Sequence, residues 1–179
     1  MKKPLPAQLV LASASEMQQL QSWFSSAEQQ HCWGGDNFTY PCSEMQFLAQ
    51  LRRPATTSYS LVAEQDGRLL GFGQLCDRFG CHHLARLVVS PALRGQGLAK
   101  VLLSELFIKG LYQQHRVFSL YVHRHNTIAL KLYTEIGFTV TTQPEAENTR
   151  LLFMTLSPEQ AVKLTNNYLQ QLSRSVDVR

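Results

Sequence analysis

The chain has 179 residues, enough for one domain that buries a sizeable core without disulfide or metal staples. Hydrophobic residues make up 44% and charged residues 17%, which excludes a disordered chain, and no apolar run is long enough to span a membrane. The net charge of +4 is mild, and the basic residues are not interleaved with aromatic ones as in single-strand nucleic-acid binders. We therefore expect neither a nucleic-acid nor a membrane partner.

The first residues resemble a secretory signal peptide, with two lysines ahead of an apolar stretch. Pro4, Pro6 and Gln8 interrupt that stretch and leave residues 9–11 as its continuous apolar part. A signal peptide needs roughly 7 apolar residues in a row. We therefore expect a cytoplasmic protein whose cysteines stay reduced.

The N-terminal segment predicts a short strand and a helix. Residues 8–12 favour the strand, and Ser13 with Glu16 forms a capping box that begins the helix. An aromatic, turn-rich loop is expected next, over residues 31–41.

A second helix and a hairpin follow this loop. Ser43 and Gln46 form another capping box ahead of apolar residues at helical spacing. Residues 58–64 and 68–76 are rich in β-formers and are joined through Asp66-Gly67, a dipeptide typical of tight hairpin turns.

The rest of the chain alternates strands and helices. A strand over residues 82–89 is followed by Gly95, Gly97 and a helix with apolar residues along one face. A helix over residues 126–136 is expected to end at Gly137. Three more β-rich segments complete the sheet: residues 116–122, 138–142 and 150–155. Ser157-Pro158 begins a C-terminal helix that could pack on its own domain or against a second copy in a homodimer.

Thiol and imidazole groups are frequent enough to raise the question of a zinc site. The candidate ligands are His31, Cys32, Cys42, Cys81, His82 and His83. Their spacing matches no zinc motif, so we expect packing cysteines and no metal.

The turn from Arg94 to Ala99 lies between a strand and a helix, where unpaired amide groups and the positive helix end can hold an anion. Glycine lets the backbone approach phosphate oxygens closely. Residues 84–134 carry several basic residues and a single acidic one, Glu105, which favours a polyanionic ligand. A plain tight turn is the alternative. A Walker site is a poor match, because no Lys-Ser or Lys-Thr follows the glycines. A Rossmann site would need G-x-G-x-x-G after the first strand of a parallel unit, whereas hairpins come first here.

Two segments resemble the GNAT superfamily of acetyl-CoA-dependent N-acetyltransferases. The first is Arg94-Gly95-Gln96-Gly97-Leu98-Ala99, and the second is Asn126 to Phe138, which fits N-x-x-A-x-x-L-Y-x-x-x-G-F at every specified position. The resemblance implies an α/β (α+β) fold with a mixed, mostly antiparallel central sheet, helices on both faces and a splayed cofactor cleft. It covers the chain from Gln8 to Thr155, so we predict a domain over residues 1–156 and a helical extension over 157–179.

The resemblance also implies a binding mode for acetyl-CoA. The amides from Gly95 to Ala99 would hold the pyrophosphate, and the strand that carries Leu87, Val88 and Val89 would pair with the pantetheine arm. Asn126 would bind the same arm, although capping its own helix is an equally good interpretation.

Acetylation of an amine needs a neutral nucleophile, an oxyanion donor and an acid for the leaving thiolate, because an alkyl ammonium has a pKa near 10.4. By resemblance Tyr133 is the acid, with a buried packing tyrosine as the alternative. Relatives often supply a glutamate base, which the strands here lack. His83 takes its place, similar in type and position to a histidine of arylalkylamine N-acetyltransferases. Strand alternation would put His83 on the same face as Leu87 and Val89.

The acceptor is expected to meet the loop between the first two predicted helices. Its candidate residues are Trp33, Asp36, Phe38 and Tyr40, an aromatic wall with a carboxylate that would suit a cationic amine. Simple packing of these rings is the alternative. The predicted function is transfer of acetyl from acetyl-CoA to a small-molecule primary amine. Two alternatives stay open, a peptide Nα-acetyltransferase and a silent acyl-CoA-binding module.

Overall fold

The computed structural model describes residues 6–145 and 148–176, and the chain divides into two compact units. The first unit comprises Met1–Cys76 and Ala85–Leu102, and the second comprises Asp77–Leu84 and Leu103–Arg179. Lys2 and Lys3, the two lysines that make the first residues resemble a signal peptide, lie outside the described residues. The boundary between the predicted domain and its helical extension, at residue 156, stays a prediction. The residues before and after it belong to the same second unit.

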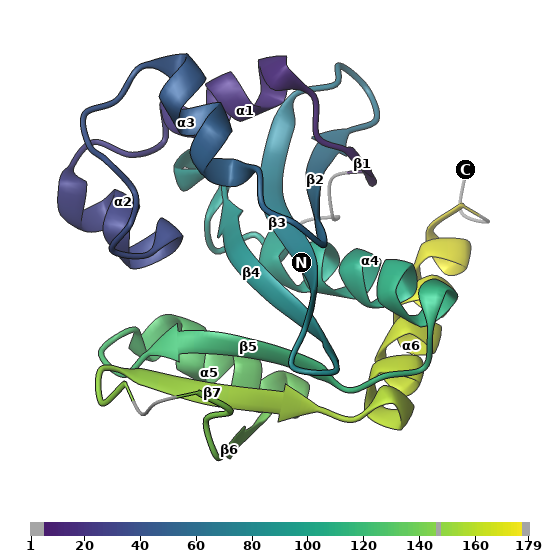
Figure 1. The fold of residues 1–179 in the computed structure, drawn as a ribbon. Coiled ribbons are helices and arrows are strands. Elements are labelled where there is room, and N and C mark those ends of the chain that lie inside the picture. Colours follow the sequence, from purple (N-terminus) through teal and green to yellow (C-terminus); the bar gives the residue numbers. More distant parts are fainter. Residues whose placement is uncertain (1–5, 146–147, 177–179) are drawn as a thin grey trace. The chain divides into compact units, whose positions relative to one another are not determined.

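Within the described residues, seven strands form a mixed sheet in the order β1-β2-β3-β4-β5-β7-β6, with six α-helices (Figure 1). The strands are β1 (Ala7–Leu11), β2 (Thr56–Ala63), β3 (Leu69–Arg78), β4 (Cys81–Val89), β5 (Phe118–His123), β6 (Thr139–Thr141) and β7 (Leu151–Leu156). β4 pairs with β5 in parallel, whereas β1–β2, β2–β3, β5–β7 and β6–β7 are antiparallel. The predicted α/β fold class, with its mostly antiparallel sheet, is confirmed.

β4 contributes residues to both units. Its first part pairs with β5 over three residue pairs, His82 with Phe118, His83 with Ser119 and Leu84 with Leu120. Residues 85–89 belong to the first unit, where Ser90 donates its amide to the carbonyl of Leu70. The predicted separation of β4 from β5 beyond these pairs stays a prediction.

The first unit holds helices α1 (Ala14–Gln21), α2 (Ala27–Gly34) and α3 (Glu44–Leu51). Both predicted capping boxes are present, at Ser13 and at Ser43. α2 was not predicted, and the expectation of a loop from residue 31 was wrong in its first part. Its signal is Ser26, whose hydroxyl accepts a hydrogen bond from the amide of Gln29 at 3.2 Å.

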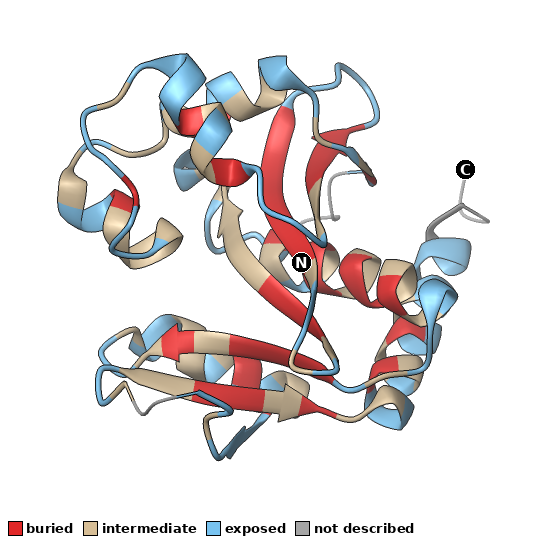
Figure 2. Ribbon diagram, viewed as in Figure 1, coloured by how far each residue is buried: buried red, intermediate tan, exposed pale blue. Residues whose placement is uncertain are grey.

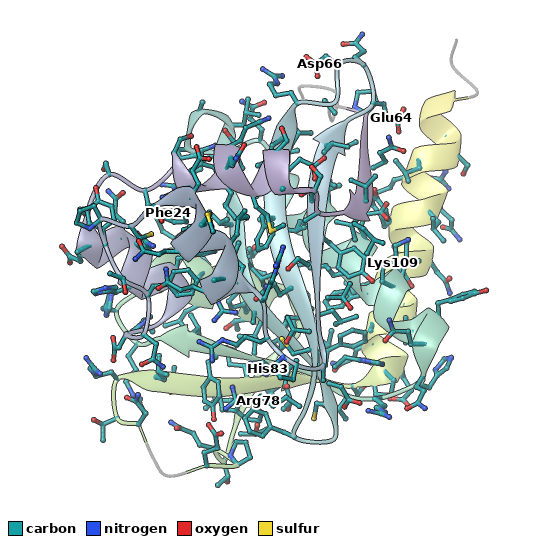
Figure 3. All side chains as sticks on the ribbon, turned by 45° about the horizontal axis from the view of Figure 1, so that its top comes forward. Phe24, Glu64, Asp66, Arg78, His83 and Lys109 are labelled. Atoms are coloured by element: carbon teal, nitrogen blue, oxygen red, sulfur yellow. The ribbon has the colours of Figure 1, made fainter. Side chains whose placement is uncertain are left out.

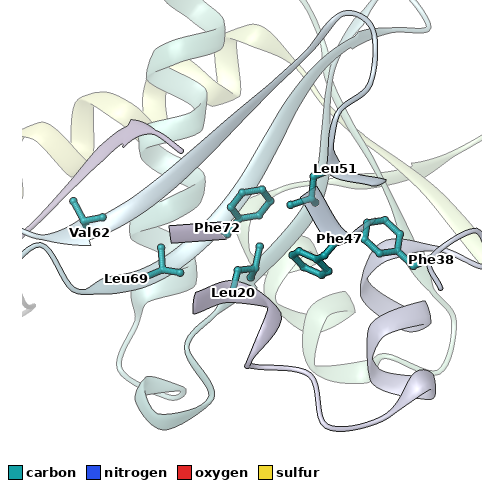
Figure 4. Packing of buried hydrophobic residues seen from close by; sticks show 7 residues of the cluster. All are labelled: Leu20, Phe38, Phe47, Leu51, Val62, Leu69 and Phe72. Carbon is teal, nitrogen blue, oxygen red and sulfur yellow. The ribbon is translucent and has the colours of Figure 1, made fainter. Parts of the chain in front are cut away.

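The core of the first unit lies between these helices and β2–β3 (Figure 4). It consists of large apolar side chains that are buried almost completely: Leu20, Phe38, Phe47, Leu51, Val62, Leu69 and Phe72. Burying such a side chain contributes roughly 1.5–3 kcal/mol. This packing fixes the segment between α2 and α3 against the sheet of the same unit.

The second unit holds most of α4 (Leu98–Gln113), together with α5 (Thr127–Ile136) and α6 (Pro158–Val176). Figure 2 shows buried and exposed residues on different faces of α6, as its amphipathic sequence requires. Gly137 ends α5 with a φ of 110°, as predicted. The core includes Phe107, whose ring lies 4.9 Å from that of Phe118 between centroids.

Across residues 6–145 and 148–176, none of the helices combines the length and apolarity that crossing a membrane requires.

Candidate active site

The predicted phosphate turn is an exposed loop between β4 and α4, wholly within the first unit. A short 3₁₀ turn (Pro91–Leu93) precedes it. Gly95 and Gly97 have φ of 74° and 81°, a conformation that side chains other than glycine rarely adopt, and a Cβ on either would meet no atom within 4 Å. The turn is therefore open above both glycines.

Helix α4 begins directly after this turn at Leu98. The amides of Lys100 and Val101 already donate to the carbonyl of Gly97, at 3.0 and 3.3 Å. The amides that precede them belong to the part of a helix that has no intrahelical acceptor. This geometry fits a pyrophosphate, since the first amides and the positive end of α4 lie at the open loop.

The strand ahead of the turn is irregular at Arg86, which has a φ of 52° inside β4. A non-glycine residue in this region is uncommon and is typical of a bulge, which interrupts the alternation of side chains. We expected strand alternation to put His83, Leu87 and Val89 on one face. That expectation assumed a regular strand, and the assumption was wrong, because the irregular backbone at Arg86 interrupts the alternation. Leu87, Val88 and Val89 are half-buried.

The side chain of Arg86 takes part in a network of buried polar groups. Its Nη1 donates to Oε1 of Gln74, which is completely buried. Gln74 Nε2 in turn donates to the carbonyl of Leu51 and to Oγ of Ser58, both at 2.9 Å. The guanidinium carbon of Arg86 lies 5.1 Å from the ring centroid of Phe38. Arg86 thus joins the sheet to the segment between α2 and α3.

Trp33 lies in the same network. Its Nε1 donates to the carbonyl oxygen of Arg86 at 2.7 Å. Its ring stacks against Phe24 and Phe47, at centroid distances of 4.5 and 6.0 Å. Of the four residues predicted to meet the acceptor, Trp33 and Phe38 therefore lie together against Arg86.

The other two predicted acceptor residues, Asp36 and Tyr40, lie on the exposed part of this segment. Thr39, between them, donates its amide to Oε1 of Gln50 at 2.6 Å, and its carbonyl accepts a hydrogen bond from the buried Gln30 at 3.4 Å. The segment is thereby fixed to α2 and α3, with Asp36 and Tyr40 toward solvent.

His83 lies in the second unit and is buried. Its Nδ1 is 2.9 Å from Oγ of Ser119, and its ring lies near those of Phe79, Tyr121 and Phe153, at centroid distances of 5.4, 5.6 and 6.3 Å. Burial, and then the charge of Arg78, lowers the pKa of His83 to about 4. The imidazole is therefore neutral at physiological pH.

Arg78 connects this ring cluster to the β6–β7 connection. It lies close to His83 (Figure 3), stacks on Phe79 at 4.4 Å and pairs with Glu145. A cavity of about 400 Å³ next to this ion pair is lined by Glu145 and Phe153, among other residues. Burial, and then Glu145, raises the pKa of Tyr121.

Tyr133 lies on α5 with its ring 5.8 Å from that of Phe138 between centroids. Burial raises the pKa of Tyr133 to about 12, so its hydroxyl keeps its proton at physiological pH. Asn126 caps the same helix, because its Oδ1 accepts the amide of Ala129 at 3.1 Å. The capping interpretation of Asn126 is thus confirmed, and a role in cofactor binding stays a prediction.

The candidate zinc ligands do not meet in the described part of the chain, where no group of three or more histidine, cysteine or acidic residues is placed to hold a metal ion. The cysteine side chains are half-buried.

Sequence reasoning missed Arg86, Gln74 and Ser119. A polar residue inside an apolar strand was the available signal for Gln74 and Ser119, since buried polar groups need partners. The unusual φ of Arg86 has no such signal in the sequence.

Comparison with known proteins agrees with this geometry. Residues 17–138 match the model of the acetyltransferase (GNAT) family. Spermidine N-acetyltransferase from Vibrio cholerae, solved with CoA and spermine, has the same fold, with a TM-score of 0.68 at 15% identity over 87% of this chain and 98% of that chain. A Klebsiella pneumoniae protein provisionally assigned as an acyl-CoA N-acyltransferase superposes with a TM-score of 0.59 at 20% identity, over 84% and 97% of the two chains.

The fold and the open glycine turn agree with this family match. The chain belongs to the GNAT acetyltransferase family.

Proposed function

We propose that the protein transfers an acetyl group from acetyl-CoA to the primary amine of a small molecule. The observation that carries this proposal is the Arg94–Ala99 turn, in which two glycines of positive φ open onto the start of α4. Family membership supports acetyl transfer, and the spermine bound to the Vibrio cholerae enzyme supports a small amine as the acceptor.

In this proposal the amides from Gly95 to Ala99 hold the pyrophosphate, and the main chain of Leu87, Val88 and Val89 pairs with the pantetheine arm. Leu98 is buried and anchors the turn, whereas Gly95, Gln96 and Gly97 are exposed and free to meet the ligand. Bound acetyl-CoA supplies the thioester carbonyl.

Tyr133 acts in this proposal as the donor to the leaving thiolate. A pKa of about 12 keeps the phenol protonated, which a donor requires. Such a pKa lies well above that of an ordinary thiol, about 8.5, so the hydroxyl stabilises the thiolate mainly through a hydrogen bond.

His83 acts as the proton acceptor. It is neutral, as an acceptor must be, yet a pKa of about 4 makes it too weak to deprotonate a free ammonium with a pKa near 10.4. It suits the more acidic ammonium that forms once the amine has attacked the thioester. A base with the ordinary histidine pKa would make kcat/KM fall below about pH 6.5. With the lowered pKa of His83, this fall is expected near pH 4 instead.

The proposal is tested by release of free CoA thiol from acetyl-CoA with polyamines, arylalkylamines, aminoglycosides and N-terminal peptides. Turnover with a small amine supports it. Turnover with peptides alone would establish a peptide Nα-acetyltransferase instead, and acetyl-CoA binding without turnover would establish a silent acyl-CoA-binding module. The expected cytoplasmic location and homodimer stay predictions.

A further inference from the structure

We propose that Trp33 is a positioning residue for acetyl transfer: by binding the carbonyl of Arg86, its indole aims the amide of Leu87 at the thioester of bound acetyl-CoA. This inference rests on the proposed function, in which the main chain of Leu87 lies beside the pantetheine arm. It deepens that function by naming a residue that acts through the strand. All three residues belong to the first unit.

The carbonyl of Arg86 and the amide of Leu87 are the two ends of one trans peptide group. In such a group the C=O and N–H bonds point in opposite directions, because the group is planar. Trp33 Nε1 donates to this carbonyl at 2.7 Å and thereby also fixes the direction of the amide hydrogen. A donor that is aimed in advance stabilises a developing negative charge without reorganising during the reaction.

Two contacts show which way the main chain of β4 faces around Leu87. The carbonyl oxygen of Val88 lies 3.2 Å from the position that a Cβ on Gly71 would occupy, and Ser90 donates its amide to the carbonyl of Leu70 at 2.8 Å. The main-chain groups of Val88 and Ser90 therefore face β3. Those of Leu87 face the opposite edge of β4, because successive residues of a strand alternate in this respect.

That opposite edge is unpaired at Leu87. β5 is the neighbour of β4 on this side, and its last pair with β4 joins Leu84 to Leu120. Leu87 is half-buried, and its amide donates to no described residue in the loops that surround the sheet. The amide is thus directed toward the edge along which the proposed function places the pantetheine arm.

The indole that holds this peptide is itself fixed by aromatic neighbours (Figure 4). It stacks on Phe24 and Phe47, and it meets Phe38 and Phe72 edge-on at centroid distances of 5.6 and 6.1 Å. Phe38, Phe47 and Phe72 are buried almost completely. A ring packed on several sides keeps its Nε1 in one place, so the donor cannot follow a peptide that rotates.

The backbone of Arg86 needs this support. A φ of 52° is uncommon for a residue other than glycine and persists only where the surrounding structure holds it. Gln74 accepts a hydrogen bond from the guanidinium and restrains the side chain, whereas Trp33 restrains the peptide group itself. Without the indole donor, this peptide can rotate and the amide of Leu87 loses its direction.

The aimed amide acts on the thioester oxygen. The amine nitrogen forms a bond to the thioester carbon, and the C=O electron pair moves onto the oxygen, which accepts a hydrogen bond from Leu87. When the carbonyl re-forms, the C–S bond breaks and the sulfur leaves with its electron pair, while the ammonium proton passes to His83 as in the proposed function. Complete removal of such a donor lowers kcat by roughly 10²- to 10³-fold, so a misdirected one should cost roughly 10-fold or more.

Two altered proteins remove the donor of the indole. Trp33→Phe keeps an aromatic ring of smaller size. The second keeps the size as well: the chain has two tryptophans, so uniform incorporation of benzothienylalanine into a Trp23→Phe protein exchanges the N–H of Trp33 alone for sulfur. Trp23→Phe with ordinary tryptophan is the control, because the indole of Trp23 makes no hydrogen bond to a described residue and lies at the edge of the same core.

The first measurement is the carbonyl resonance of acetyl-CoA labelled with carbon-13 at the thioester carbon, bound to each protein. A hydrogen bond to the carbonyl oxygen moves this resonance downfield. We expect a downfield displacement relative to free acetyl-CoA in wild type and in the control, and its loss in both proteins without the donor. Calorimetry should show nearly unchanged affinity for acetyl-CoA, because the glycine turn is untouched. A purely structural role of Trp33 would not move the resonance.

The second measurement is kcat with the best amine of the panel. It should fall roughly 10-fold or more in both proteins without the donor, with little change in KM for acetyl-CoA, since the hydrogen bond strengthens in the transition state. No displacement in wild type, an equal displacement in all proteins, or an unchanged kcat would overturn the inference and leave acetyl transfer intact. The benzothienylalanine protein decides if Trp33→Phe does not fold.

Failure of the proposed function gives a different result. If wild type binds acetyl-CoA but turns over no amine, the proposed activity is wrong, and the carbonyl resonance alone decides whether Trp33 aims the amide. If wild type does not bind acetyl-CoA, the proposed function and the inference are both refuted.

Discussion

Trp33 and Arg86 lie 53 residues apart and are joined by a hydrogen bond of 2.7 Å from the indole nitrogen to the main-chain carbonyl. The bond connects α2 to the one position of β4 where the backbone turns to positive φ. The segment predicted to meet the acceptor is thus hydrogen-bonded to the strand predicted to bind the cofactor.

Replacing Trp33 by phenylalanine tests this connection. The variant keeps an aromatic ring but leaves the carbonyl of Arg86 without its donor, which should lower the free energy of unfolding by about 1–3 kcal/mol. Trp23→Phe is the control, because the indole of Trp23 makes no hydrogen bond to a described residue and lies at the edge of the same core. Urea denaturation should show the larger loss for Trp33→Phe. Equal losses would mean that ring volume alone matters.

Gly97→Val should abolish acetyl-CoA binding. Valine is strained at a φ of 81°, and its side chain would stand in the open space above the turn where phosphate oxygens should lie. Gly67→Val provides a matched control, since Gly67 has a φ of 67° and open surroundings in the β2–β3 turn. Calorimetry should detect binding by the control alone. Unchanged affinity in a folded Gly97→Val protein would move the phosphate site elsewhere.

His83 should make the protein less stable in mild acid. Its folded pKa of about 4 lies below the ordinary value of 6.5, so the unfolded chain binds more protons between these values. Its stabilising contribution is complete above pH 6.5 and is lost as pH falls through 4, by about 3 kcal/mol in total. Unfolding free energies at several pH values should show this slope in wild type and in His115→Gln, an exposed control, but a reduced slope in His83→Gln. An identical slope in all three proteins would contradict the burial of His83.

Tyr133→Phe should lower kcat by roughly 10²-fold with nearly unchanged acetyl-CoA affinity, because the ring stays and only the donor is lost. A pKa of about 12 further predicts that wild-type kcat shows no alkaline loss from this group below pH 10. Tyr112→Phe, at an exposed position near the end of α4, should have no effect. Normal turnover by the Tyr133 variant would leave this residue a packing role.

The elements that the sequence predicted well are those with local signals. Ser13 and Ser43 cap their helices through side chains three residues away, and Gly137 supplies the left-handed conformation that ends α5. Such signals act within one turn of chain and can be read without knowledge of the tertiary structure. α2 was missed although Ser26 and Gln29 provide the same kind of signal, because the aromatic residues after them favoured a loop.

The candidate site was predicted only in part. The glycine turn is local and was found, whereas the environments of His83 and Arg86 depend on contacts with residues distant in sequence, Ser119 and Gln74. The rule that successive side chains alternate between the two faces of a sheet holds only in a regular strand, and β4 is irregular at Arg86.

The amide of Gln74 limits which residues can be inherited at this position of β3. Its oxygen faces Arg86, while its nitrogen faces Leu51 and Ser58, so each end of the group has a different neighbour. In Gln74→Glu an oxygen would replace the nitrogen that donates to the carbonyl of Leu51, so two acceptors would face each other in a buried site. A single inherited substitution in β3 would therefore weaken the connection between Arg86 and α3, without altering any residue of the glycine turn.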